Sequence, residues 1–141
     1  MTLAWTESID GVDWDELAAL YHAAPLGKKD PDGLRTAFAN SMFVCFVREQ
    51  GRLVGAGRAV ADGVDMSYIA DVALLPSHQG MGLGKGIVQR LMERSRGHKK
   101  IILYSVPGKE AFYQKLGFRK MCTAMAVFED QDAAAQRGFI E

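Results

Sequence analysis

Residues 71–85 combine an apolar strand, a glycine-rich turn and the start of a helix, a combination that suits the binding of an anion. Residues 72–75 form an uninterrupted apolar run, which is typical of a strand covered on both faces. Gly80, Gly82 and Gly84 follow, and glycines permit positive φ and bring a ligand close to the backbone. A helix that begins just after the second glycine would point free N–H groups into the turn, as phosphate sites do. A tight strand-to-helix connection without a ligand stays open as the alternative.

Two nucleotide-binding motifs and one hydrolase motif fail in this sequence. A Walker A loop needs a glycine early in the loop and Ser or Thr after its Gly-Lys pair, but Gln79 and Gly86 hold those places. The Gly-x-Gly-x-x-Gly pattern ends on Lys85 or on Ile87, depending on the glycine from which it is counted. A Gly-x-Ser-x-Gly elbow does not occur in the sequence, which argues against a Ser–His–Asp hydrolase.

The elements that position this turn alternate between strand and helix patterns. Strands are expected at residues 3–9, 42–47, 53–61, 66–75, 101–106, 118 and 121–128, and helices at 14–21, 34–38, 83–96 and 107–116. The three strands at 42–47, 53–61 and 66–75 are expected to be antiparallel. The helical crossover at 83–96 makes the strand at 101–106 parallel to the one at 66–75. The pattern predicts an α+β (α/β mixed) fold, with one mixed, mostly antiparallel sheet of six to seven strands and about four helices.

Composition narrows the class of protein. With 141 residues, of which 48% are hydrophobic, the chain is expected to form a single domain over 1–141. The net charge of zero argues against a nucleic-acid partner, and no apolar run is long enough to cross a membrane. The absence of a secretory signal pattern predicts a cytoplasmic protein. Cys45 and Cys122 lie in apolar stretches and are interpreted as buried free thiols, and no ligand spacing suggests a metal.

Two motifs resemble those of one enzyme family. The run Gln79-Gly80-Met81-Gly82-Leu83-Gly84 resembles the Gln/Arg-x-x-Gly-x-Gly/Ala signature of the GNAT (Gcn5-related) N-acetyltransferases. About thirty residues later, Ala111-Phe112-Tyr113-Gln114-Lys115-Leu116-Gly117-Phe118 resembles the second hallmark of that family. Residues 25–32, 58–63 and 69–72 are also similar to the serotonin N-acetyltransferase-like branch. The resemblance therefore implies the GNAT fold.

The resemblance implies that acetyl-CoA is the acetyl donor. Its pantetheine arm would lie along Val72, Ala73 and Leu74, where the strand splays from residues 101–106. An N–H of Ala73 or Leu74 would polarise the thioester carbonyl. The residues that would hold the pyrophosphate are Gln79, Gly80, Met81, Gly82, Leu83, Gly84 and Lys85. His78, one residue before them, is expected on the loop surface.

The resemblance also implies a pair of catalytic groups. Tyr113 stands where the family places its general acid, and a phenol with a reference pKa of about 10 can protonate a departing thiolate. A packing role for Tyr113 is the alternative. Asp71 is the candidate for a base or for an amine anchor, with a strand-end carboxylate that caps backbone N–H groups as the alternative.

The acceptor is expected to be a small primary amine, either an arylalkylamine or a polyamine-like compound. Tyr21, Phe38 and Met125 are the candidates for an apolar acceptor pocket, although core packing competes for the first two. Gly108 stands where many family members have Asn, and Val106 where some serotonin-type relatives have a polar residue, so the branch does not settle the substrate. A protein lysine or N-terminal acceptor, and a non-catalytic acyl-CoA sensor, are the alternatives. Pairing of two copies through the C-terminal strands is common in the family.

Overall fold

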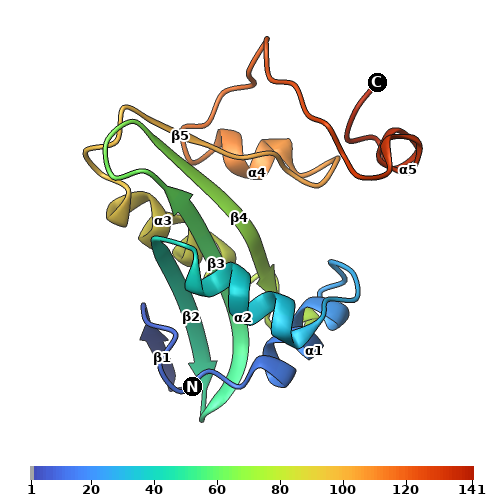
Figure 1. Ribbon diagram of the computed structural model, residues 1–141. Coiled ribbons are helices and arrows are strands. Elements are labelled where there is room, and N and C mark those ends of the chain that lie inside the picture. The colour runs from blue at the N-terminus through green and yellow to red at the C-terminus, as the bar shows by residue number, and fades with distance from the viewer. Residues whose placement is uncertain (1) are drawn as a thin grey trace. The chain divides into compact units, whose positions relative to one another are not determined.

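The computed structural model describes residues 2–141, and its internal contacts divide the chain into two compact units (Figure 1). The first unit is Met1–Leu103 and the second is Tyr104–Glu141. Among the residues described, no helix is both long enough and apolar enough to cross a membrane. The expectation of a single domain stays a prediction.

The first unit is built on a five-stranded mixed sheet. Its strands lie side by side in sequence order: β1 (Leu3–Thr6), β2 (Phe43–Glu49), β3 (Arg52–Ala61), β4 (Met66–Leu74) and β5 (Lys100–Ile102). Neighbouring strands pair antiparallel from β1 to β4, and β5 pairs parallel to β4. The mixed, mostly antiparallel sheet is thus confirmed, whereas the expected six to seven strands are one or two too many.

One face of the sheet is covered by two helices, α1 (Trp14–Ala23) and α2 (Pro31–Ala39) (Figure 1). Each begins at an aspartate whose carboxylate accepts backbone N–H bonds: Asp13 for α1 and Asp30 for α2. Phe38 of α2 stacks on Phe46 of β2 with ring centroids 5.5 Å apart, and both rings are buried. This aromatic contact joins α2 to the sheet.

The opposite face is covered by α3 (Leu83–Arg94), which follows the short 3₁₀ helix η1 (Pro76–His78). Gly55 and Gly57 of β3 lie under α3, because a Cβ on either residue would stand within 3.0 Å of the Ile87 side chain. A Cβ on Gly86 would likewise stand 2.9 Å from the Trp5 ring. These glycines let α3 pack directly on the sheet and fix where its first turn lies.

The second unit contains α4 (Glu110–Gln114) and α5 (Gln131–Gln136) but no strand. The strands expected at 118 and 121–128 do not form. Met125 is 96% exposed, and an apolar alternation becomes a strand only when a partner strand is available to pair with it. The pairing of two copies through these residues stays a prediction. Cys122 is exposed rather than buried, whereas Cys45 is buried as expected.

Candidate functional site

The glycine turn presents an open helix start. Gly80 and Gly82 have φ of 80° and 81°, and α3 begins at Leu83, as the sequence predicted. Side-chain capping is absent at this N-terminus, and a Cβ on Gly80 or Gly82 would meet nothing within 4 Å. Backbone N–H groups at the positive end of the helix dipole are thus left for a ligand, as an anion site requires.

The strand that leads into the turn has an unpaired edge. β5 pairs with β4 only from Met66 to Tyr68, so the rest of β4 has no strand partner on that side in residues 2–141. The N–H of Leu75 donates to the carbonyl of Val54 at 2.9 Å, toward β3. Because N–H groups alternate in direction along a strand, the N–H of Leu74 points to the unpaired edge and that of Ala73 toward β3. The sequence offered the N–H of Ala73 or that of Leu74 as the donor to the thioester. The hydrogen bonding between β3 and β4 favours Leu74.

A β-bulge interrupts β4 just before this segment. Ala56 of β3 pairs with Ala73, but Arg58 pairs with Ala70, so β4 has one more residue than β3 between these pairs. Asp71 lies in the bulge with φ of 57°, a left-handed conformation that few residues other than glycine adopt. The bulge therefore separates β4 into a part paired with β5 and a part that leads to the glycine turn.

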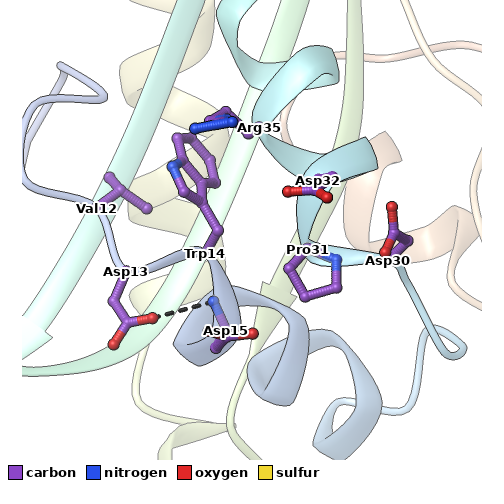
Figure 2. A pocket seen from close by; sticks show the side chains of 8 residues that line it. All are labelled: Val12, Asp13, Trp14, Asp15, Asp30, Pro31, Asp32 and Arg35. Carbon is purple, nitrogen blue, oxygen red and sulfur yellow. Dashed lines mark hydrogen bonds between the residues drawn. The ribbon is translucent and has the colours of Figure 1, made fainter.

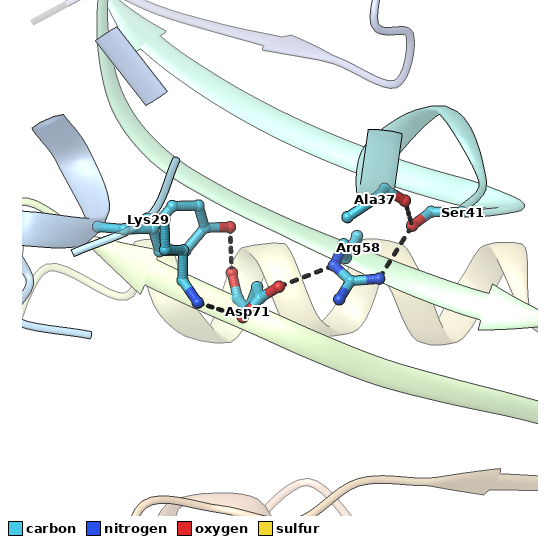
Figure 3. Close-up of polar contacts among 6 residues, drawn as sticks. Lys29, Ala37, Ser41, Arg58 and Asp71 are labelled. Atoms are coloured by element: carbon cyan, nitrogen blue, oxygen red, sulfur yellow. Dashed lines mark hydrogen bonds and ion pairs between the residues drawn. The ribbon is translucent and has the colours of Figure 1, made fainter. Parts of the chain in front are cut away.

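Asp71 is held by polar contacts from three other segments (Figure 3). Its carboxylate accepts from Nε of Arg58 at 2.7 Å and lies 3.6 Å from Nζ of Lys29. Nη1 of Arg58 donates to Oγ of Ser41 at 3.3 Å. The backbone carbonyl of Asp71 accepts from the Tyr21 hydroxyl at 2.6 Å. The carboxylate proposed as a base or amine anchor is thus already paired with two cations.

Two of the residues expected to line an acceptor pocket belong to the core instead. Tyr21 is 0% exposed and Phe38 is 1% exposed. Burial raises the pKa of the Tyr21 phenol well above its ordinary value, and the negative charge of Asp71 acts in the same direction. Tyr21 therefore acts as a hydrogen-bond donor to the bulge, while Phe38 packs between Phe46 and Trp14.

His78 also departs from its expected place on the loop surface. The residue is 8% exposed, and its ring nitrogens contact Oγ of Ser77 at 2.8 Å and a carboxylate oxygen of Glu49 at 3.2 Å. This contact ties η1 to the end of β2, next to the start of the glycine turn. His78 is thus a structural support of the turn.

Tyr113, the expected general acid, belongs to α4 in the second unit. Its ring makes edge contacts with Phe112 and Phe118, and burial raises the pKa of its phenol above 10.0. The helix is short, and the Glu110 carboxylate accepts the N–H of Gly108 at 2.6 Å just before it. Met125, the third residue expected at the acceptor pocket, is exposed in the same unit.

An open pocket of about 500 Å³ lies where α1 and α2 begin (Figure 2). Two of its aspartates, Asp13 and Asp30, cap the two helices, so their carboxylates already accept backbone N–H bonds. None of the expected site residues lines it: the lining is Val12, Asp13, Trp14, Asp15, Asp30, Pro31, Asp32 and Arg35. No group of three or more potential metal ligands gathers anywhere in residues 2–141.

Comparison with known proteins points to one family. The profile described as "Acetyltransferase (GNAT) family" matches residues 11–118. The chain is 34% identical over 113 residues to GCN5-related N-acetyltransferase 1, chloroplastic, of Arabidopsis thaliana, covering 77% of this chain and 57% of that protein. It is 33% identical over 117 residues to Serotonin N-acetyltransferase 2, chloroplastic, of Oryza sativa, covering 79% and 58%. The chain thus spans less than two thirds of the length of these curated relatives.

The fold has close counterparts among solved structures. A GNAT family acetyltransferase from Streptococcus pneumoniae superposes with a TM-score of 0.78 at 21% identity, covering 92% of this chain and 100% of that one. At this identity the likeness concerns the fold alone.

Proposed function

Because this chain belongs to the GNAT family of acetyltransferases, we propose that it transfers the acetyl group of acetyl-CoA to the primary amine of a small molecule. The observation that carries the proposal is that an unpaired strand edge and an open helix N-terminus follow each other directly along the chain. The unpaired edge of β4 leads through η1 directly into the open N-terminus of α3. A long ligand with a diphosphate at one end and amides along its length fits such a segment.

The donor is proposed to follow this segment. Its diphosphate binds the backbone N–H groups between Gln79 and Lys85, and the exposed Lys85 side chain adds positive charge. The pantetheine arm runs along residues 72–74, and the N–H of Leu74 polarises the thioester carbonyl. These contacts come from the backbone, so they tolerate many side chains and leave the choice of acceptor to other residues.

The reaction is proposed as direct attack in a ternary complex. The neutral amine nitrogen bonds to the acetyl carbon, the carbon–sulfur bond breaks, and its electron pair leaves with sulfur. The Tyr113 hydroxyl protonates the thiolate and regains a proton from solvent, while the amine loses its extra proton to solvent. The products are the N-acetyl amine and CoA. The role of Tyr113 rests on the second motif, and its raised pKa keeps the phenol protonated, as an acid must be.

For the acceptor we favour an arylalkylamine over a polyamine. Lys29 and Arg58 place two positive charges around the single carboxylate of Asp71, one residue before the proposed path of the donor. A multiply charged polyamine is repelled by this excess, whereas an amine with one basic nitrogen is affected less. The similarity to a protein named as a serotonin N-acetyltransferase supports the same choice. The cytoplasmic location and the homodimer stay predictions.

The test is a screen of purified protein with acetyl-CoA against aromatic monoamines, polyamines, a lysine peptide and a peptide with a free N-terminus. Release of free thiol and mass spectrometry of the product are the readouts. We expect turnover of aromatic monoamines, and a loss of turnover in Tyr113→Phe with retained binding of acetyl-CoA. If the wild-type protein binds acetyl-CoA tightly and acetylates none of the amines, the sensor hypothesis replaces the enzyme. Turnover of the peptides alone would show a protein acetyltransferase.

A further inference from the structure

The bulge at Asp71 decides which backbone N–H groups of β4 face the unpaired edge. If the pairing of Arg58 with Ala70 continued without an extra residue, Leu74 would take the place of Leu75 opposite Val54. Its N–H would then point toward β3, because a shift of one residue reverses every direction along a strand. The extra residue thus sets the direction of the donor that the thioester needs.

A left-handed residue inside a strand persists only when the surrounding structure holds it there. Here the Tyr21 hydroxyl from α1 binds the carbonyl of Asp71, and the Arg58 guanidinium from β3 binds its carboxylate. Arg58 is held in turn by Ser41, whose hydroxyl donates to the carbonyl of Ala37 in α2 (Figure 3). Tyr21 is fully buried, so the removal of its hydroxyl would leave the carbonyl of Asp71 without that donor.

We propose that Tyr21, Arg58 and Asp71 are positioning residues, which hold the β4 bulge so that the N–H of Leu74 points at the acetyl thioester. The proposal rests on the proposed function, since it concerns the same donor site. It differs from the base role that the sequence suggested for Asp71. In the base role the carboxylate accepts a proton from the amine, whereas here it anchors a backbone conformation and accepts no proton.

Substitutions at Asp71 separate these two roles. Asn adopts the left-handed conformation readily and keeps an oxygen for Arg58, but it cannot act as a base. Ala neither favours that conformation nor accepts a hydrogen bond from Arg58. We expect Asp71→Asn to keep kcat within about threefold of wild type with an unchanged pH profile, and Asp71→Ala to lose about tenfold or more. Equal losses in both variants, with a changed pH profile, would overturn the proposal in favour of the base.

Tyr21→Phe tests the second contact that holds the bulge, the hydrogen bond from the Tyr21 hydroxyl to the carbonyl of Asp71. The variant keeps the buried ring and removes only the donor to Asp71. We expect kcat to fall about tenfold while the Kd for acetyl-CoA, measured by calorimetry, changes less than about twofold. Ser95→Ala is the matched control, because Ser95 is also buried and its hydroxyl bonds to Ser67 and to the carbonyl of Leu91 at the far end of α3. The control should lose stability and keep kcat. An unchanged kcat in Tyr21→Phe would contradict the positioning role of Tyr21.

A readout without turnover keeps this inference separate from the proposed function. The backbone amide signal of Leu74 is followed by nuclear magnetic resonance in titrations with acetyl-CoA and with CoA. We expect the two ligands to give different Leu74 shifts in wild type and in Ser95→Ala, and the difference to shrink in Tyr21→Phe. A protein that acetylates no amine but shows this pattern would refute the proposed function alone. A Leu74 difference that persists in Tyr21→Phe would refute the positioning role.

Discussion

Gly57 of β3 and Ile87 of α3 lie so close that a Cβ on Gly57 would stand 2.8 Å from Cγ2 of Ile87. The same Cβ would stand 3.1 Å from Leu91 and 3.3 Å from Val72. Gly57 also lies opposite the β4 bulge, between the residues that pair with Ala70 and Ala73. The contact between α3 and the sheet and the conformation of β4 therefore depend on the same small residue.

Gly57→Ala is expected to lower the free energy of unfolding by about 1–3 kcal/mol, because the added methyl overpacks the interface beneath α3. Urea denaturation followed by circular dichroism measures the change. Gly33→Ala is the matched control: Gly33 lies in α2, where a Cβ would meet nothing closer than 3.6 Å. That variant should be neutral or gain about 0.5 kcal/mol from helix propensity. Equal effects in the two variants would contradict the close packing of α3.

Gly82→Asp is expected to raise the Kd for acetyl-CoA by at least about tenfold, because the new carboxylate stands where the diphosphate is proposed to bind. Calorimetric titration with acetyl-CoA is the measurement. Gly51→Asp is the control, since Gly51 has the same φ of 81° and the same open surroundings but lies in the β2–β3 turn. A Kd in Gly82→Asp that matches the control would show that the glycine turn does not hold the donor.

Local signals in the sequence were enough to place the glycine turn. The start of α3 at Leu83 and the bounds of β3 and β4 were predicted within one residue, because glycines, prolines and apolar runs act over a few neighbouring residues. The β-bulge could not be predicted in this way, since it depends on the register between two strands. One signal was present: Arg58 and Asp71 are opposite charges in two apolar strands that were expected to pair.

The residues expected to line the acceptor pocket could not be told from core residues by the sequence. Tyr21 and Phe38 recur at helical spacing, and this pattern predicts burial without saying whether a core or a pocket covers the rings. The structure places both in the core. Met125 was assigned to the pocket from its apolar side chain alone, but it is 96% exposed. The strand expected around it does not form, because strand formation depends on a partner that the local sequence does not specify.

The two cysteines are expected to differ in reactivity. Burial raises the pKa of the Cys45 thiol to about 12, so at neutral pH it is not a nucleophile, whereas Cys122 is exposed. Dithionitrobenzoate should therefore modify one thiol per native chain, at Cys122, and a second only after unfolding in guanidinium. Cys122→Ser should abolish the reaction of the native protein. Rapid reaction of two thiols in the native wild-type protein would contradict the burial of Cys45.

The pH profile of acetyl transfer is expected to carry the signature of Tyr113. Because burial raises the pKa of its phenol, the acid form persists to higher pH than in an ordinary tyrosine. With an aromatic monoamine as acceptor, kcat should rise as the amine deprotonates, and any fall caused by ionisation of Tyr113 should lie at higher pH than an ordinary tyrosine would give. Tyr113→Phe should lower kcat about a hundredfold and remove that alkaline fall. A variant with unchanged kcat at every pH would leave Tyr113 as a packing residue.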